Sequence, residues 1–189
     1  PLQSHQNVSS AVIVLTPSGQ RRPGWTTGRT VGSPLRSNYF TPNNPVVVVD
    51  LDRNGTLEIV VTFDDGTIRA YRENGTQIWS YNYASGRALY ASEVAVGDIS
   101  GDGLPEIVFG TYSYDGSANG SVGMSALNAG TGQLLAGFPL PLPNEGTSTT
   151  AIQGVIAGPT LADLDRNCSV ELIAHSKGGS LYAWNTPGR

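Results

Sequence analysis

The chain has 189 residues, of which 39% are hydrophobic and only 14% are charged, and its formal net charge is −4 at pH 7. This acidic balance, with a single lysine at Lys177, argues against a nucleic-acid partner. No apolar run reaches transmembrane length, and one cysteine excludes an internal disulfide. The 24 glycines and 12 prolines are typical of many short strands and turns.

The chain opens with a short hairpin signal. Residues 11–15 are apolar, a Pro-Ser-Gly turn follows at 17–19, and 22–25 ends in Trp25. Residues 26–45 are polar and rich in Gly and Pro, so we expect them to link this hairpin to the rest of the chain. The sequence begins at Pro1 without an initiator Met, which favours a processed chain.

Three longer units follow, each with the same order of apolar runs and turns. The runs before an acidic loop are 46–49, 94–96 and 159–162; those after it are 59–61, 107–109 and 172–174; third segments follow at 66–71, 120–127 and 179–184, and fourth segments at 77–81 and 133–138. Such β-branched and aromatic runs between Gly and Asn turns predict strands and hairpins, and few helices. Four-stranded antiparallel meanders that recur at intervals of 48 and 65 residues indicate an all-β chain of β-propeller-type blades.

Nine of the fifteen acidic residues lie in three similar nine-residue loops, 50–58, 98–106 and 163–171. Oxygen-bearing side chains occupy positions 1, 3, 5 and 9, and glycine follows at position 6 in the first two loops. Alternate side chains of a tight loop converge, the position-7 carbonyl adds a ligand, and a hard cation relieves the carboxylate repulsion. The pattern therefore predicts calcium sites. A turn without an ion is the alternative, which the threefold recurrence disfavours.

These loops and strands resemble the FG-GAP/VCBS repeat, the calcium-bearing propeller blade also found in integrin α-subunits and many bacterial surface proteins. The resemblance covers roughly 10–25 and 46–189. The ligand set that it implies is Asp50, Asp52, Asn54, Thr56 (carbonyl) and Glu58; Asp98, Ser100, Asp102, Leu104 (carbonyl) and Glu106; and Asp163, Asp165, Asn167, Ser169 (carbonyl) and Glu171. Ser100 departs from the pattern at position 3. Cys168 replaces glycine at position 6, where a positive φ should cost on the order of 1 kcal/mol.

We therefore expect a single propeller-like domain over 1–189. It divides into an outer half-blade at 10–25, blades with a calcium loop at 46–90 and 91–155, and a partial blade with a calcium loop at 156–189. Closed propellers usually have four or more blades. With about three to four blades, the chain is a partial propeller, a part of a larger ring completed by further sequence or other chains, or an irregular small propeller. Exposed strand edges would also permit self-assembly.

The resemblance implies an extracellular or cell-surface, secreted, structural or adhesive module that binds up to three Ca²⁺ and contacts protein or glycan ligands through its loops. Millimolar Ca²⁺ outside cells would fill even sites of ~10⁻⁴–10⁻³ M affinity. The alternative is the propeller portion of a carbohydrate-active enzyme such as a polysaccharide lyase. We predict no enzymatic activity, because His175 and Ser176 lie in no catalytic motif and the metal loops account for the paired carboxylates.

Aromatic residues and sequons add smaller expectations. Tyr112 and Tyr114, in an extended hairpin, are candidates for stacking on sugars, whereas exposed tyrosines without a ligand are commoner. Packing between blades is the expected role of Trp25, Trp79 and Trp184. Sequons stand at Asn7, Asn54, Asn74, Asn119 and Asn167. Three of them, Asn7, Asn74 and Asn119, are candidate surface glycosylation sites, and Asn54 and Asn167 should stay bare as metal ligands.

Overall fold

The computed structural model describes residues 10–25, 29–31, 46–63, 65–113, 115–143 and 152–186, and strands dominate them. Within these ranges the only helical element is a 3-10 turn, η1 (Asn119–Ser121). The strands are β1 (Ser10–Val12), β2 (Arg29–Val31), β3 (Val47–Val49), β4 (Glu58–Thr62), β5 (Thr67–Tyr71), β6 (Gln77–Asn82), β7 (Leu89–Gly97), β8 (Glu106–Ser113), β9 (Gly123–Asn128), β10 (Leu140–Pro141), β11 (Thr160–Ala162), β12 (Glu171–His175) and β13 (Leu181–Asn185).

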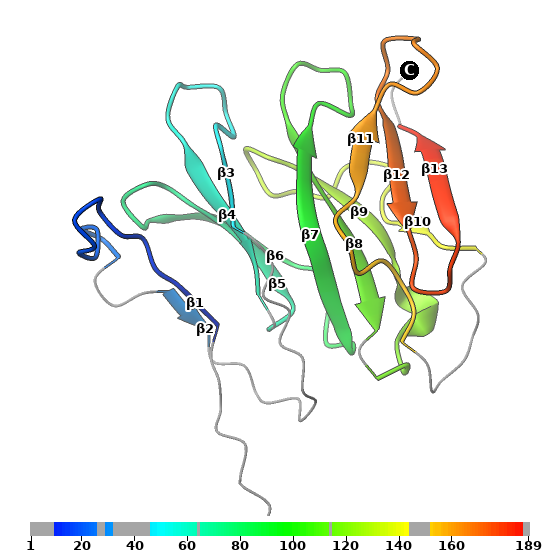
Figure 1. Cartoon of the computed structure of the whole chain (residues 1–189), viewed down its shortest axis with the longest axis horizontal. Helices are drawn as coiled ribbons and strands as arrows, with labels where there is room; N and C mark the ends of the chain where they lie inside the picture. Colours follow the sequence, from blue (N-terminus) through cyan, green and yellow to red (C-terminus); the bar gives the residue numbers. More distant parts are fainter. Residues whose placement is uncertain are drawn as a thin grey trace, which may run out of the picture.

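These strands form four antiparallel sheets in chain order (Figure 1). The orders are β1-β2, β3-β4-β5-β6, β7-β8-β9-β10 and β11-β12-β13. Each of the last three sheets is a meander, because every strand pairs with its neighbour in sequence. Strand β7 contacts β4 of the preceding sheet and β11 of the following one. Successive four-stranded sheets side by side are the arrangement of β-propeller blades, as the sequence predicted.

The sheets share two hydrophobic cores. The larger one joins the last three sheets, from Val60 and Ile68 through Phe109 and Met124 to Leu172. A smaller one places Val12 and Trp25 of the N-terminal segment against Ile59, Val61, Phe63 and Tyr71 of the β3–β6 sheet. Every residue of β4 is buried, because the neighbouring layers cover both of its faces.

Two tryptophans fasten neighbouring layers in the same way. The indole Nε1–H of Trp25 donates to the carbonyl of Glu73, in the β5–β6 turn, at 2.9 Å. The Nε1–H of Trp79, on β6, donates to the carbonyl of Ala129, just after β9, at 2.8 Å. Both side chains are buried. The expected packing role between blades is thus confirmed for these two, and Trp184 stacks on Tyr182 at 5.2 Å between ring centroids.

The N-terminal hairpin differs from the prediction. The turn at 17–19 is present, with Leu15 bridged to Arg21, but the ladder partner of β1 is β2 at Arg29–Val31. Part of the expected linker is therefore a strand. Pro23 has no amide hydrogen to donate to a ladder, and Gly24 has a positive φ of 84°, so the chain turns here instead of continuing the hairpin.

The fourth strand of the second blade was also misplaced. The expected segment at 133–138 contributes only an isolated bridge, between Leu127 and Leu134. The strand is β10, Leu140–Pro141, which pairs with the start of β9. Gly137, with a φ of 86°, turns the chain before it can run along β9. A strand containing proline suits this sheet edge, because an edge strand needs fewer amide donors.

Candidate metal centres

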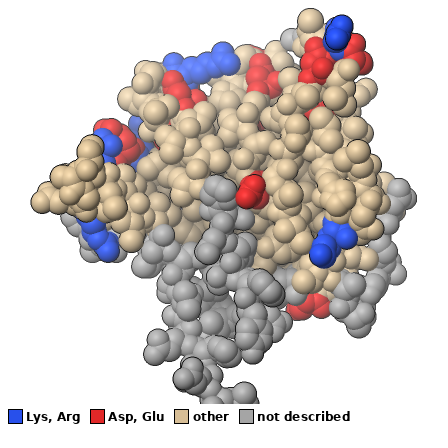
Figure 2. Space-filling view, in the orientation of Figure 1, with Lys and Arg blue, Asp and Glu red and all other residues tan. Residues whose placement is uncertain are grey.

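The three acidic loops lie at the same end of the sheets, each between the first and second strands of its sheet (Figure 1). The first joins β3 to β4, the second joins β7 to β8, and the third joins β11 to β12. Figure 2 shows acidic side chains gathered at this end of the molecule, over the three loops. This position, between the first two strands of each sheet, is the one that the sequence predicted for the acidic loops.

The first loop is held by its own side-chain oxygens. Asp50 accepts the amide hydrogens of Asn54 (3.0 Å) and Gly55 (2.8 Å) on its two carboxylate oxygens. Asn54 Oδ1 accepts the amide of Thr56 at 2.8 Å, and the Thr56 hydroxyl donates to the same oxygen. These contacts coil the loop so that alternate side chains face inward.

The third loop repeats this geometry closely. Asp163 accepts the amide hydrogens of Asn167 (3.1 Å) and Cys168 (3.0 Å), and Asn167 Oδ1 accepts that of Ser169 (2.7 Å). Asp165 also accepts the Asn167 amide at 3.1 Å, as Asp52 does with Asn54 in the first loop at 3.2 Å. The equivalent residues therefore adopt equivalent conformations although position 6 is cysteine in one loop and glycine in the other.

The second loop reaches a similar coil through different contacts. Asp98 accepts the amide hydrogens of Gly101 (2.7 Å) and Gly103 (2.9 Å). Ser100 Oγ accepts the amide of Asp102 at 3.3 Å and donates to Glu106 Oε1 at 3.1 Å. Ser100 thus does inside the loop what an aspartate does at the same position of the other two, and it also occupies a glutamate oxygen.

The position-9 glutamates are the buried members of each loop. Glu58, Glu106 and Glu171 expose only 2%, 0% and 5% of their surface. One oxygen of each accepts the amide of the position-2 residue, at 3.0 Å from Leu51, 2.8 Å from Ile99 and 2.7 Å from Leu164. A buried carboxylate is costly unless its charge and its lone pairs are matched. Each loop therefore contains a buried negative charge, at its position-9 glutamate, that needs compensation.

The second oxygen separates the three glutamates. Glu58 Oε1 lies 3.2 Å from the Thr56 hydroxyl, whose single hydrogen it shares with Asn54 Oδ1, and Glu106 Oε1 accepts the Ser100 hydroxyl. Glu171 Oε1 is buried and has no hydrogen-bond partner among the described residues. Such an orphaned oxygen calls for a cation or another donor. The third loop thus fits a metal on an observation that is independent of its residue pattern.

Carboxylates converge in two of the loops. Asp50, Asp52 and Glu58 each place a carboxylate oxygen within 4.8 Å of the others, and Asp163, Asp165 and Glu171 do the same. Within the described part of the chain the second loop brings no such triad together, because position 3 is Ser100 and its third carboxylate, Asp102, stands at position 5. An all-oxygen donor set is the kind that hard cations such as Ca²⁺ prefer.

Burial dominates the electrostatics of the second loop. Burial raises the pKa of Glu106 above its usual value, the hydrogen bonds from Ile99 and Ser100 act in the opposite direction, and the neighbouring Asp102 charge raises the pKa further. The surroundings therefore disfavour the ionised form of Glu106, and a bound cation would stabilise it.

Backbone conformation at position 6 follows the expectation. The φ values are 88° at Gly55, 89° at Gly103 and 68° at Cys168, so the cysteine does stand in the left-handed region. Position 4 was not predicted to be special, yet it is left-handed in all three loops: Arg53 (57°), Gly101 (75°) and Arg166 (62°). Position 4 lies between turns formed by the Asp and Asn side chains, which leave it few conformations other than the left-handed one. The high content of Asp and Asn in the loops was the sequence signal for this conformation.

The other candidates fare less well. Tyr112 lies in β8, is half-buried, and packs edge-on against Tyr90 at 5.8 Å; burial raises its pKa to about 12. It is thus not the exposed loop residue that sugar stacking requires, and Tyr114 lies outside the described residues. Asn119 is buried, which removes it from the candidate glycosylation sites. His175 is exposed at the end of β12, and the adjacent Ser176 is fully buried.

The fold and the loops together define a β-propeller-type module with acidic blade loops. Comparison with known families specifies the repeat: residues 50–109, which contain the first two loops, match the FG-GAP-like repeat. Over these residues the match confirms the resemblance that the sequence analysis named. No curated protein matches the sequence significantly.

Among solved structures, the chain is similar to the C-terminal domain of PilY1 from Pseudomonas aeruginosa, with 16% sequence identity and a TM-score of 0.49. The similarity covers 76% of this chain and 30% of the other, so the chain spans about a third of that structure's length. Among the described residues no helix has the length and apolar character to cross a membrane.

Proposed function

We propose that this propeller-type module binds Ca²⁺ in its three loops and serves as a non-enzymatic, extracellular structural or adhesive unit. The observation that carries the proposal is Glu171 Oε1, a buried carboxylate oxygen in the third loop without a hydrogen-bond partner among the described residues. Two carboxylate triads and three buried position-9 glutamates support the same conclusion. Bound Ca²⁺ would offset the repulsion between these groups and fix the loops that join the inner strands.

The ligands would be the side chains at positions 1, 3, 5 and 9 and the carbonyl at position 7 of each loop. In this role the residues hold the ion and the loops, and no covalent bond is made or broken. Asp50 and Asp163 coil their loops through the amides at positions 5 and 6, and Glu58 and Glu171 hold the strand ends to the loop. Outside cells even weak sites would be occupied, because the Ca²⁺ concentration there is millimolar. Protein or glycan partners would then meet loops or strand edges held by the ions.

A thermal melt in EDTA, with Ca²⁺ and Mg²⁺ added back separately, tests the proposal. Saturation of one site at a hundred times its Kd should add about 2.7 kcal/mol, which for a chain of this size raises Tm by about 5–10 °C. Mg²⁺ should do little, since it tolerates irregular oxygen cages poorly. The control carries Asp50→Asn, Asp98→Asn and Asp163→Asn and should respond to neither ion.

Recording the mass in solution during the same experiment separates a folding role of Ca²⁺ from a role in assembly. An unchanged Tm with Ca²⁺ would refute calcium binding. Cleavage of an acidic polysaccharide by the purified chain would instead favour the enzyme alternative, whatever the melt shows.

A further inference from the structure

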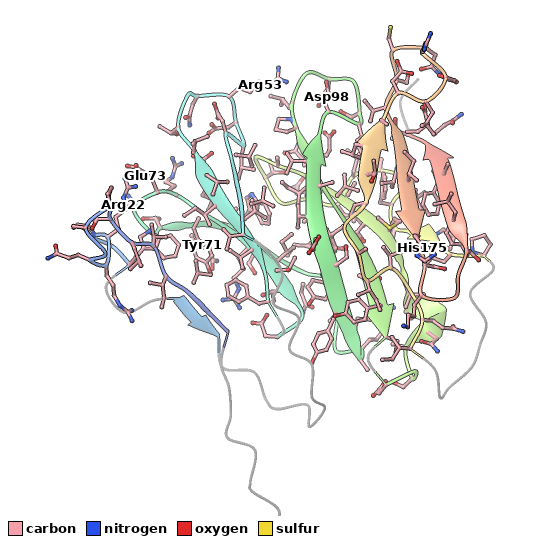
Figure 3. All side chains as sticks on the ribbon, viewed as in Figure 1. Arg22, Arg53, Tyr71, Glu73, Asp98 and His175 are labelled. Atoms are coloured by element: carbon pink, nitrogen blue, oxygen red, sulfur yellow. The ribbon has the colours of Figure 1, made fainter. Side chains whose placement is uncertain are left out.

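The loops of neighbouring blades meet through two fixed positions of the repeat. Position 4 of the first loop is Arg53, and position 6 of the second loop is Gly103. The Arg53 Nη1 atom lies 3.8 Å from the point where a Cβ on Gly103 would stand. Figure 3 shows the Arg53 side chain directed toward the β7–β8 loop that carries Asp98. The Arg53 guanidinium thus reaches from the first loop toward position 6 of the second loop.

The equivalent gap between the second and third loops is hollow. Position 4 is here Gly101, which has no side chain to reach across, and position 6 of the third loop is Cys168. A cavity of about 60 Å³ lies between them, with Gly101 on one side and Cys168 on the other. The cavity therefore occupies the place that corresponds to the Arg53 guanidinium one blade earlier.

The walls of this cavity are suited to a cation that donates hydrogen bonds. Its polar side chains are Asp98, Ser100, Ser169 and Thr186, besides Cys168. Asp98 is the only charged residue among the described residues that line it. Hydroxyl and carboxylate oxygens accept hydrogen bonds from a planar guanidinium, which has five donors and no acceptor.

The surrounding charge has the same sign. Asp98, Asp102 and Glu106 give the second loop three carboxylates, and position 4, which carries arginine in the other loops, is neutral here. Arg53, which lies beside Gly103, offsets one of these charges, so the second loop is net negative by two without calcium and neutral with one divalent ion. A cationic group is therefore attracted most strongly when the loop holds no calcium.

We propose that the cavity between the second and third loops is a binding site for a guanidinium group, namely the side chain of an arginine presented by a partner protein. The guanidinium takes the place that corresponds to the Arg53 guanidinium one blade earlier. The site lies on the exposed loop end of the blades, where a partner can reach it. Asp98 belongs both to the cavity wall and to the ligands of the proposed calcium site, so binding of the cation is tested in EDTA, where this proposal and calcium binding can fail separately.

The first test uses N-acetyl-arginine amide and its neutral isostere N-acetyl-citrulline amide as probes, with amide chemical shifts as the readout in EDTA. The arginine probe should shift the amides of 99–101, 168–170 and 186, with a Kd on the order of 1–10 mM, as suits a small ligand with few contacts. The citrulline probe should leave them unchanged. Equal shifts with both probes, or shifts confined to other parts of the chain, would overturn the proposal.

The matched variants are Gly101→Arg and Gly101→Ala. Arginine at position 4 is compatible with a left-handed backbone, as Arg53 and Arg166 show, so Gly101→Arg should fold and fill the cavity. This variant should bind the arginine probe at least about tenfold more weakly, a loss of 1.4 kcal/mol. Gly101→Ala imposes the same backbone cost and should retain binding. Undiminished binding in Gly101→Arg would place the probe elsewhere.

A measurement on the unmodified chain guards against a misfolded variant. Cys168 is the only cysteine in the sequence, it is exposed, and it lines the cavity. Its rate of alkylation by iodoacetamide, followed by mass spectrometry, should fall with the arginine probe and not with the citrulline probe. The same rate with both probes would show that the cavity does not hold the cation.

Discussion

The second and third loops share a pattern of nine positions but satisfy their buried glutamates differently. Glu106 receives three hydrogen bonds, from the amides of Ile99 and Ser100 and from the Ser100 hydroxyl. Glu171 receives one, from Leu164, and its second oxygen is left without a partner among the described residues. The second loop can therefore fold around its own donors, whereas the third has a buried carboxylate oxygen that the proposed Ca²⁺ would satisfy.

The difference shows how one residue changes what a repeat requires. A serine at position 3 donates a hydrogen bond to Glu106 and takes the place of a charged metal ligand. Asp165 at the same position of the third loop adds a negative charge beside Glu171. Stability without calcium and affinity for calcium should thus vary in opposite directions between these loops. The first loop lies between them, because the Thr56 hydroxyl reaches Glu58.

Removing each glutamate should have the largest effect and should separate the loops most clearly. In EDTA, Glu106→Ala should lower the free energy of unfolding by about 3 kcal/mol, because the buried amide of Ile99 and its neighbour lose their acceptor. Glu171→Ala should cost only about 1 kcal/mol, since it also removes an unsatisfied oxygen. Urea unfolding followed by circular dichroism measures both. Equal losses would contradict the distinction.

Ser100→Asp should bring the second loop closer to the other two. It adds a carboxylate to the ligand set, so Ca²⁺ affinity should rise about tenfold, or 1.4 kcal/mol. Stability in EDTA should fall, because Glu106 loses a donor and gains a neighbouring charge. Calorimetric titration in a background of Asp50→Asn and Asp163→Asn isolates this site. Ser100→Asn, which adds an oxygen without charge, is the control and should gain less affinity.

Cys168→Gly should have the smallest effect. Cys168 adopts a φ of 68°, where glycine avoids the Cβ clash, so the variant should gain at most about 1 kcal/mol in thermal unfolding. Cys168→Ala keeps the Cβ and should leave stability nearly unchanged. A gain in both variants would mean that the thiol, rather than the backbone, carries the cost.

The loops were predictable from sequence because their structure is local. The hydrogen bonds of Asp50, Asn54 and Glu58 each join residues at most seven positions apart, so the spacing alone indicates which side chains converge. The strands before and after the loops followed from their apolar runs. The prediction failed where a partner is distant: β2 at Arg29–Val31 and β10 at Leu140–Pro141 have too little apolar pattern to reveal the strands with which they pair.

The relation between loops could not be predicted at all. Arg53 is conspicuous in the sequence, but its position beside Gly103 depends on how two blades lie side by side. The same holds for the cavity between Gly101 and Cys168, residues 67 positions apart that only the packing of the sheets brings together. Local rules specify each loop, whereas tertiary packing decides what lies between two of them.

The two indole hydrogen bonds give the molecule built-in optical reporters. Trp25 and Trp79 sit at different layer boundaries, each buried and each bonded to a carbonyl of the next layer. When a boundary opens, its indole enters water and its emission should move to longer wavelength. Variants that lack Trp184 and keep only one of these two would therefore reveal whether the layers separate together or one at a time, as the modular energetics of repeat proteins permits.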